Sequence, residues 1–456
     1  MPRSRMWSSI ITRHIGDLQV TKDGALAETP GIYDFGGTVT DDIVYNVSIK
    51  WLVRQVIPSW AVSFGGDEDE VTEGVAIADN GDIVVAGYTS SFGSAMHEVM
   101  VFRTDFNGHL RWAKVYSNDN PNTSNRVYSI ELADNGDIVA VGYTIDYGTS
   151  ESDMLVLRVG QDGTLKWVKT YNGFTRQAND VVIGSNGDII VVGYYYDSEA
   201  SIDDMAVVRL DQDGSVLWAK RYDAGGVENA YGVALAGNGD IIVVGTITLR
   251  LDSSGNVIWA RSLGGDKVAV ADNGDVIVVG TSGNDIIVTK LDQNGNLKWA
   301  KTYGGPDTEL IGNVAIDNDG NIIVVGSTYS FGQGALDALV IKLDSNGNVL
   351  WAKTYGGADS DFAYSVRVLN DNSIIVVGRT NSYGVSGSYD ALVIKLGKDG
   401  NLESDAPRSG EASLTVNDIT ESTSLTSPSI VVNAVSPTVG SISITEISPE
   451  VVVTRL

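Results

Sequence analysis

The sequence repeats itself, and tryptophan marks the repeat most clearly. Seven tryptophans stand in one context, which the best-preserved copies write as GNLKWAKTYGG and GNVLWAKTYGG. A glycine closes a run of valines and isoleucines in each repeat, as in ADNGDIVVAGYTSSFG. Successive tryptophans lie about 40 to 55 residues apart, a period typical of units that pack side by side into one array. The tryptophans are Trp60, Trp112, Trp167, Trp218, Trp259, Trp299 and Trp351, and the glycines are Gly87, Gly142, Gly193, Gly245, Gly280, Gly326 and Gly378.

Each repeat predicts four short β-strands. Runs rich in valine and isoleucine, such as Ile374–Gly378 and Ala391–Leu396, are bounded by glycine, asparagine and aspartate, which is typical of strands buried on both faces. Asn-Gly pairs such as Asn80-Gly81 join the first two strands. We expect type I′ hairpins there, because Asn-Gly readily supplies two positive φ angles. Since no long helical pattern interrupts the repeats, the chain is predicted to be all-β.

Seven such units predict a seven-bladed β-propeller. The tryptophan strand comes last in each unit, yet the seventh unit has no tryptophan where one is expected, near Ser404. The surplus tryptophan strand is the first one, around Trp60. We therefore expect residues 58–64 to close the ring as the outer strand of the last blade, which removes two free sheet edges.

The two ends of the chain differ from the repeats. Residues 1–57 form an extension that is partly β, with a degenerate strand pair at 31–53, and the propeller occupies residues 58–403. Residues 404–456 lack aromatic side chains and are rich in serine, threonine and valine. They predict a β module or stalk, with a disordered tail as the alternative. Because unpaired apolar strands associate, both end segments favour self-assembly.

The repeats resemble the SBBP-type propeller repeat of predicted prokaryotic surface proteins, over about residues 58–403. The segment VIKLDSNGNVLWAK also resembles a PQQ-like blade, in a weaker match. The PQQ-like resemblance implies that the tryptophans dock one blade on the next. The SBBP-type resemblance implies the architecture and, more loosely, a role in scaffolding or adhesion.

Composition excludes several function classes. The chain has 58 acidic against 31 basic residues and a net charge of −27, which repels a nucleic-acid backbone. It has no cysteine and three histidines without metal-ligand spacing, so zinc hydrolysis and Ser-His or Cys-His catalysis are not expected. No segment approaches the roughly 18 apolar residues of a membrane span. No signal peptide is visible at the N-terminus.

The loops between the second and third strands are the candidate binding surface. They share one face of the propeller, opposite the Asn-Gly turns, and loops on a rigid scaffold concentrate function. They are short in the fourth and fifth units, so we expect a notch on this face. Tyr195–Asp197 break the repeat, whereas aromatics that recur in each blade have packing as their alternative role. The candidate ligand-binding residues are Tyr88, Phe92, Tyr147, Tyr195, Tyr196, Asp197, Tyr329, Phe331 and Tyr383.

Four turns are similar to the start of a calcium-binding loop, at Asp211, Asp292, Asp317 and Asp344. The bidentate glutamate that completes such a loop is absent. Hairpin chemistry explains these turns, so no cofactor or metal ligand is assigned, and calcium is the alternative.

Together these patterns predict a non-catalytic propeller at an extracellular or cell surface, with a virion or appendage as the alternative location. It would bind a protein or glycan through the long-loop face and assemble through its end segments. The alternative function is a carbohydrate-active enzyme, a glycosidase or lyase with acidic residues in the notch. Glycoside cleavage needs two carboxylates about 5 to 10 Å apart.

Overall fold

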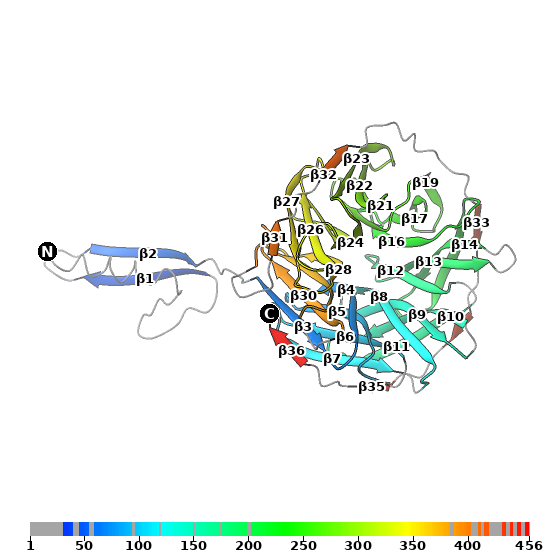
Figure 1. Ribbon diagram of the computed structural model, residues 1–456, viewed down its shortest axis with the longest axis horizontal. Helices are drawn as coiled ribbons and strands as arrows, with labels where there is room; N and C mark the ends of the chain where they lie inside the picture. The colour runs from blue at the N-terminus through cyan, green and yellow to red at the C-terminus, as the bar shows by residue number, and fades with distance from the viewer. Residues whose placement is uncertain are drawn as a thin grey trace. The chain divides into compact units, whose positions relative to one another are not determined.

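The computed structural model places seven four-stranded antiparallel sheets around one axis (Figure 1). It describes residues 31–39, 45–53, 59–93, 96–117, 120–148, 151–172, 175–197, 202–383 and 387–402, and six short strands beyond residue 402. The all-β, seven-bladed fold predicted from the repeat is therefore confirmed. The described residues include no helix that is long and apolar enough to cross a membrane.

The blades follow one another along the chain. Blade 1 comprises β4 (Glu70–Ile77), β5 (Ile83–Thr89), β6 (Glu98–Thr104) and β7 (Leu110–Ser117). Blade 2 comprises β8 (Thr123–Leu132), β9 (Ile138–Asp146), β10 (Glu151–Val159) and β11 (Leu165–Asn172). Blade 3 comprises β12 (Gln177–Ile183), β13 (Ile189–Asp197), β14 (Ile202–Leu210) and β15 (Val216–Asp223). Blade 4 comprises β16 (Ala230–Leu235), β17 (Ile241–Gly245), β18 (Thr248–Leu251) and β19 (Val257–Arg261).

The remaining blades complete the ring. Blade 5 comprises β20 (Lys267–Val270), β21 (Val276–Ser282), β22 (Asp285–Leu291) and β23 (Leu297–Gly304). Blade 6 comprises β24 (Glu309–Ile316), β25 (Ile322–Thr328), β26 (Asp337–Leu343) and β27 (Val349–Tyr355). Blade 7 comprises β28 (Asp361–Val368), β29 (Ile374–Thr380), β30 (Asp390–Leu396) and β3 (Trp60–Gly65). The first strand of each blade lies nearest the axis and contacts the first strand of the next.

An N-terminal strand closes the ring, as predicted. Strand β3 pairs antiparallel with β30, with Trp60 opposite Lys395 and Phe64 opposite Ala391. The seventh blade therefore combines the beginning and the end of the propeller sequence in one sheet. Such closure leaves neither blade 1 nor blade 7 with an exposed face, because β28 also contacts β4.

The hydrophobic core lies between the blades. Each of its seven clusters draws buried side chains from two neighbouring blades; one joins Val325 and Val340 of blade 6 to Val376 and Ile394 of blade 7. The second strand is buried along its whole length in blades such as blade 6, where β25 reads IIVVGST. This two-sided burial explains why these runs are continuously apolar instead of alternating.

The repeated tryptophans dock each blade on the next. Trp299 donates a hydrogen bond from Nε1 to the carbonyl of Ser345 (3.3 Å), and the Tyr303 hydroxyl donates to the carbonyl of Gly347 (2.6 Å). A Cβ at Gly347 would lie 2.9 Å from both aromatic side chains, and its φ is +75°. Equivalent tryptophan bonds are made by Trp60, Trp112, Trp218, Trp259 and Trp351.

The hairpin turns differ from the expected type I′ geometry. Between β4 and β5, the Gly81 N–H donates to the Ala78 carbonyl, and the Ala78 N–H donates to the Asp82 carbonyl. Only Gly81 has a positive φ, of 81°. This is a type I turn followed by one left-handed residue, which forms a G1 bulge. Three loop residues separate the closing pair, so the turn needs one positive φ and not two.

A second difference concerns the C-terminal segment, predicted as a module or stalk. Its described strands do not form a sheet of their own, and each pairs with the outer strand of a different blade (Figure 1). We call these six strands the C-terminal clasp. They are β31 (Ser409–Glu411) on blade 6, β32 (Thr415–Asp418) on blade 5, β33 (Val431–Ala434) on blade 3, β34 (Thr438–Gly440) on blade 2, β35 (Thr445–Ile447) on blade 1 and β36 (Val452–Arg455) on blade 7. The physical reason is that the outer strand of each blade offers unpaired N–H and C=O groups.

The N-terminal extension is a separate compact unit, residues 1–58. Its described residues form β1 (Gly31–Val39) and β2 (Tyr45–Val53), which pair antiparallel with Gly31 opposite Val53.

Removal of the clasp is expected to destabilise the propeller without unfolding it. A chain that ends at Leu402 loses the hydrogen bonds between the clasp and the outer strands of six blades. Each such hydrogen bond contributes about 1 kcal/mol net to the free energy of unfolding. We expect its melting temperature, followed by far-ultraviolet circular dichroism, to fall by roughly 5 to 10 °C. A chain that lacks residues 1–57 serves as the control and should melt like the parent. Equal melting temperatures for all three chains would contradict the role given to the clasp.

Candidate functional site

The predicted binding residues lie at the end of the propeller opposite the Asn-Gly turns. Two of them are well exposed: Tyr147 is 49% and Tyr329 is 54% accessible to solvent. Both follow directly on a second strand, β9 and β25. As predicted, blades 4 and 5 have short loops here, of residues 246–247 and 283–284. The notch expected beside them stays a prediction.

Other predicted residues pack within the scaffold. Tyr88 is buried, with the Arg126 guanidinium 4.3 Å from its ring centre. Phe92, Phe331 and Tyr383 lie on glycines of the preceding blade: a Cβ built on Gly66, Gly305 or Gly357 would come within 2.8, 2.6 and 3.1 Å of these aromatic side chains. These contacts agree with the alternative role of the recurrent aromatic residues, which is to pack between blades.

The segment that breaks the repeat lies at the end of β13. Tyr195 is half-buried, and the Arg221 guanidinium lies 4.4 Å from its ring centre. Tyr196 and Asp197 pair with Asp203 and Ile202 through the backbone, and their side chains lie outside the described part of the structure.

The aspartates considered for calcium are engaged by their own turns. Asp292 accepts hydrogen bonds at Oδ1 from the backbone N–H groups of Asn294 and Asn296, and at Oδ2 from the Asn296 amide (all 2.8 Å). Asp344 and Asp317 make the same set of bonds. These carboxylates act as turn caps, which explains the Asp-x-Asn-Gly pattern without an ion.

A second group of residues lies at β-bulges in the innermost strands, close to the propeller axis. Sequence reasoning missed this group. The register of six innermost strands shifts by one residue, and the extra residues are Glu73, Tyr128, Asn179, Tyr231, Gly312 and Tyr364. Bulges of this kind re-aim a side chain. The available signal was a polar or aromatic residue inside an otherwise apolar strand, such as Glu73 in EVTEGVAI.

Glu73 is the charged centre of this axial group. Burial raises the pKa of its carboxyl to about 7, although Lys267 of blade 5, Arg379 of blade 7 and Arg126 of blade 2 all favour its charged form. Charges from three other blades thus act on one carboxyl. The carboxyl therefore changes its charge near neutral pH.

Acidic residues at the junctions between blades form the third group. An acid stands at or near the start of the third strand in six blades, at Glu98, Asp153, Asp204, Asp285, Asp337 and Asp390. The first glycine of the YGG loop lies against it: a Cβ on Gly356 would be 2.0 Å from Asp337 Oδ1. The second glycine, Gly357, donates its N–H to Asp361 Oδ2 (2.8 Å) in the next blade. The YGG motif thus makes room for one carboxylate and binds another.

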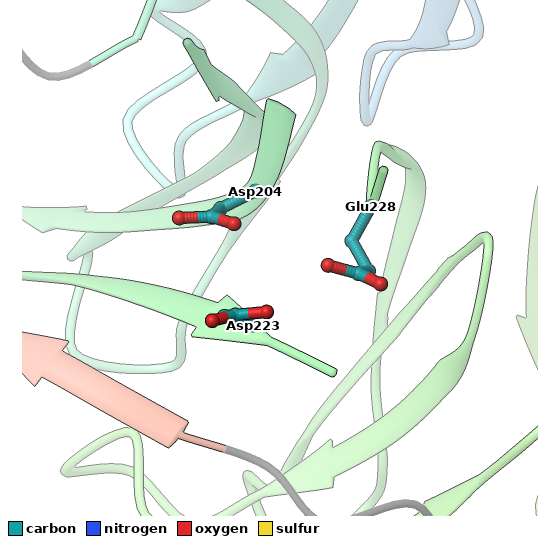
Figure 2. Close-up of side chains that lie close together, drawn as sticks. All are labelled: Asp204, Asp223 and Glu228. Carbon is teal, nitrogen blue, oxygen red and sulfur yellow. The ribbon is translucent and has the colours of Figure 1, made fainter. Parts of the chain in front are cut away.

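The junction between blades 3 and 4 departs from this arrangement. Asp223 stands at the position of the first glycine, in RYDAGG instead of TYGG. Its carboxylate meets those of Asp204 and Glu228, and one oxygen of each lies within 4.8 Å of the other two (Figure 2). Sequence reasoning did not predict this cluster, although the aspartate in a glycine position was a visible signal.

This blade 3–4 acidic cluster offers three converging carboxylates, one oxygen of each within 4.8 Å of the other two. Carboxylate oxygens are ligands of the kind preferred by hard cations.

The paired acids make stability depend on pH in a defined direction. Burial, together with the Asp361 carboxylate, raises the pKa of Asp337 to about 7. Between the ordinary pKa of an aspartate and pH 7 the folded chain binds more protons here than the unfolded chain, so stability falls as pH rises. We expect Asp337→Asn to melt higher than the parent at pH 8 and to differ less from it at pH 5. The exposed Glu68→Gln is the matched control, and an Asp337→Asn variant with the parent's pH dependence would contradict this assignment.

Two protein-family models match parts of the chain. The model described as outer membrane protein assembly factor BamB matches residues 203–381, and the model described as a domain of unknown function (DUF5122) beta-propeller matches residues 184–216 and 369–405. No curated protein is similar enough in sequence to match. The SBBP-type resemblance stays a prediction, whereas the similarity to PQQ-like and DUF5122 propellers is supported.

Solved structures with similar folds are distant in sequence. A protein of unknown function from Dyadobacter fermentans shares 13% identity, with 75% of this chain and 98% of that chain covered and a TM-score of 0.46. The Pan2 WD40 domain of Neurospora crassa shares 10% identity, over 71% and 88% of the two chains, with a TM-score of 0.46. A protein of unknown function from Bacteroides caccae shares 13% identity over 61% and 92%, with a TM-score of 0.37. None of these three structures is more than 13% identical to the chain, whose own fold is a seven-bladed β-propeller.

Proposed function

We propose that the protein is a non-catalytic propeller that binds a protein or glycan partner through its long-loop face. The observation that supports this proposal best is the exposure of Tyr147 and Tyr329, 49% and 54%, on loops that directly follow a second strand. Exposed tyrosines offer a large contact area and a hydroxyl at a low entropic cost, as binding surfaces require. Rigid second strands, such as β25, hold these loops in place.

The surroundings of His97 support a non-catalytic role. Its Nδ1 lies 3.0 Å from the buried Ser124 hydroxyl, which resembles a Ser-His pair. However, Arg126 Nη2 lies 2.9 Å from His97 Nε2 and 3.4 Å from Nδ1. Burial, together with the Arg126 charge, lowers the pKa of His97 to about 4. A histidine with so low a pKa is a weak base toward Ser124.

The location and assembly state belong to the same proposal. The resemblance to repeats of surface proteins supports an extracellular or cell-surface location. Self-assembly through residues 1–57 and 404–456, and the alternative carbohydrate-active enzyme, stay predictions.

A glycan array and a panel of surface proteins, probed with the full chain, test the proposed binding. We expect the double variant Tyr147→Ala, Tyr329→Ala to lose about tenfold or more in affinity for the ligand found, because exposed tyrosines often dominate contact energies. The control is Leu350→Ala, which removes a side chain of similar exposure (51%) from the outer strand β27.

Two outcomes would count against the proposal. Equal binding by the double variant and the parent would show that the long-loop tyrosines are not the contact surface. Release of reducing sugar from a bound glycan would show that the chain is an enzyme.

A further inference from the structure

The blade 3–4 acidic cluster is the strongest unassigned feature of the molecule. Asp204 is the third residue of β14, Asp223 ends β15, and Glu228 lies in the loop that leads to β16. Figure 2 shows the three carboxylates turned toward one common space. Their ligand-type oxygens all lie within 4.8 Å of one another.

Burial makes this convergence costly. Asp204 and Glu228 are each only 4% exposed. Oε2 of Glu228 is buried and has no hydrogen-bond partner in the part of the chain that the structure describes. Burial raises the pKa of Glu228, and the neighbouring Asp223 charge adds to this effect. A buried carboxylate oxygen without a partner is costly, so the site favours a ligand that supplies positive charge.

Arg221 brings positive charge to one side of the cluster. Its Nη1 lies 3.4 Å from Asp204 Oδ2, and its guanidinium also covers the Tyr195 ring. This ion pair engages one of the three carboxylates. Arg221 contacts Asp204, and the Glu228 carboxylate faces those of Asp204 and Asp223 (Figure 2).

The other blades serve as an internal comparison. At the junction of blades 1 and 2, Glu98 accepts hydrogen bonds from Ser117 and Asn125, which occupy the positions of Asp223 and Glu228. At the junctions that follow blades 5, 6 and 7, the residue that corresponds to Asp223 is a glycine. These glycines are Gly304, Gly356 and Gly65, respectively. At these other junctions, the acid of the third strand either receives hydrogen bonds from neutral side chains or faces at most one further acid. Among the described junctions, the one between blades 3 and 4 is the only one with a third acid.

We propose that Asp204, Asp223 and Glu228 bind one divalent cation of the calcium class. The ligand set consists of carboxylates without histidine or cysteine, which suits a hard cation. Calcium–oxygen distances of about 2.3 to 2.6 Å allow two ligands of one ion to lie up to about 5 Å apart, which accommodates the observed spacing. Water and backbone carbonyls complete the coordination of such an ion in proteins.

The cation would fix the segment from Asp223 to Glu228 onto blade 3. This segment joins a blade with a long loop to one with a short loop, beside Tyr195 of the long-loop face. The inference does not rest on the proposed partner binding, because it concerns an ion and a different set of side chains.

Titration of the chelator-treated full chain with calcium chloride, by isothermal calorimetry and thermal melting, tests the site. We expect one ion per chain and a higher melting temperature in calcium. Asp223→Gly installs the residue that the repeat uses elsewhere, and Glu228→Gln removes the charge of the buried acid. Each should weaken calcium binding by at least about tenfold, the lower end of the loss seen even when a group that only supports a metal ligand is removed.

The control is Asp337→Asn, which changes the residue of blade 6 that corresponds to Asp204 and should leave calcium binding as in the parent. If Asp223→Gly does not fold, Asp223→Asn, which keeps the side-chain shape, takes its place. Absence of calcium binding by the parent, or equal binding by the parent and the cluster variants, would overturn the proposal. Equally tight binding of magnesium would overturn the assignment to calcium.

Discussion

The unpaired edges of the β-strands are the constraint on which this structure depends. A strand at the edge of a sheet exposes N–H and C=O groups that pair with any strand available. Here β3 supplies the fourth strand of blade 7, and β36 then pairs with β3. Segments 60–65, 390–396 and 452–455 thus share one sheet, so the ring cannot open without breaking pairs between distant parts of the chain.

The contact between tryptophan and turn explains the regularity of the repeat. Trp299 and Tyr303 both bind carbonyls of the next blade's turn, and Gly347 permits their approach. The glycines of the YGG motif interact with the acids at the blade junctions. The first leaves space for one carboxylate, and the second donates its N–H to another. Because these contacts require particular residues, few positions of the repeat can change without disturbing a blade junction. Asp223 replaces one of these glycines and therefore marks a junction that differs from the others.

The sequence predicted the features that follow from period and local chemistry. Counting tryptophan strands placed Trp60 in the last blade, because a missing strand at one end and a surplus strand at the other require closure. The turn type was wrong, since Asn80-Gly81 fits both hairpin classes and the closing pair Ala78 and Asp82 decides between them. The clasp was not predictable in detail, because strands of three or four residues carry no register signal and their partners lie far away in sequence. For the same reason the cluster of Asp204, Asp223 and Glu228 becomes visible only after folding.

A crystal structure of the full chain grown with calcium chloride tests most directly whether the departure from the repeat at blades 3 and 4 creates a site. The account predicts one ion bound to oxygens of Asp204, Asp223 and Glu228 at about 2.3 to 2.6 Å. It predicts no ion at the junction of blades 6 and 7, where Gly356 takes the place of the third acid. Water alone among the three carboxylates, or equal occupancy of the Asp337 and Asp361 junction, would contradict it.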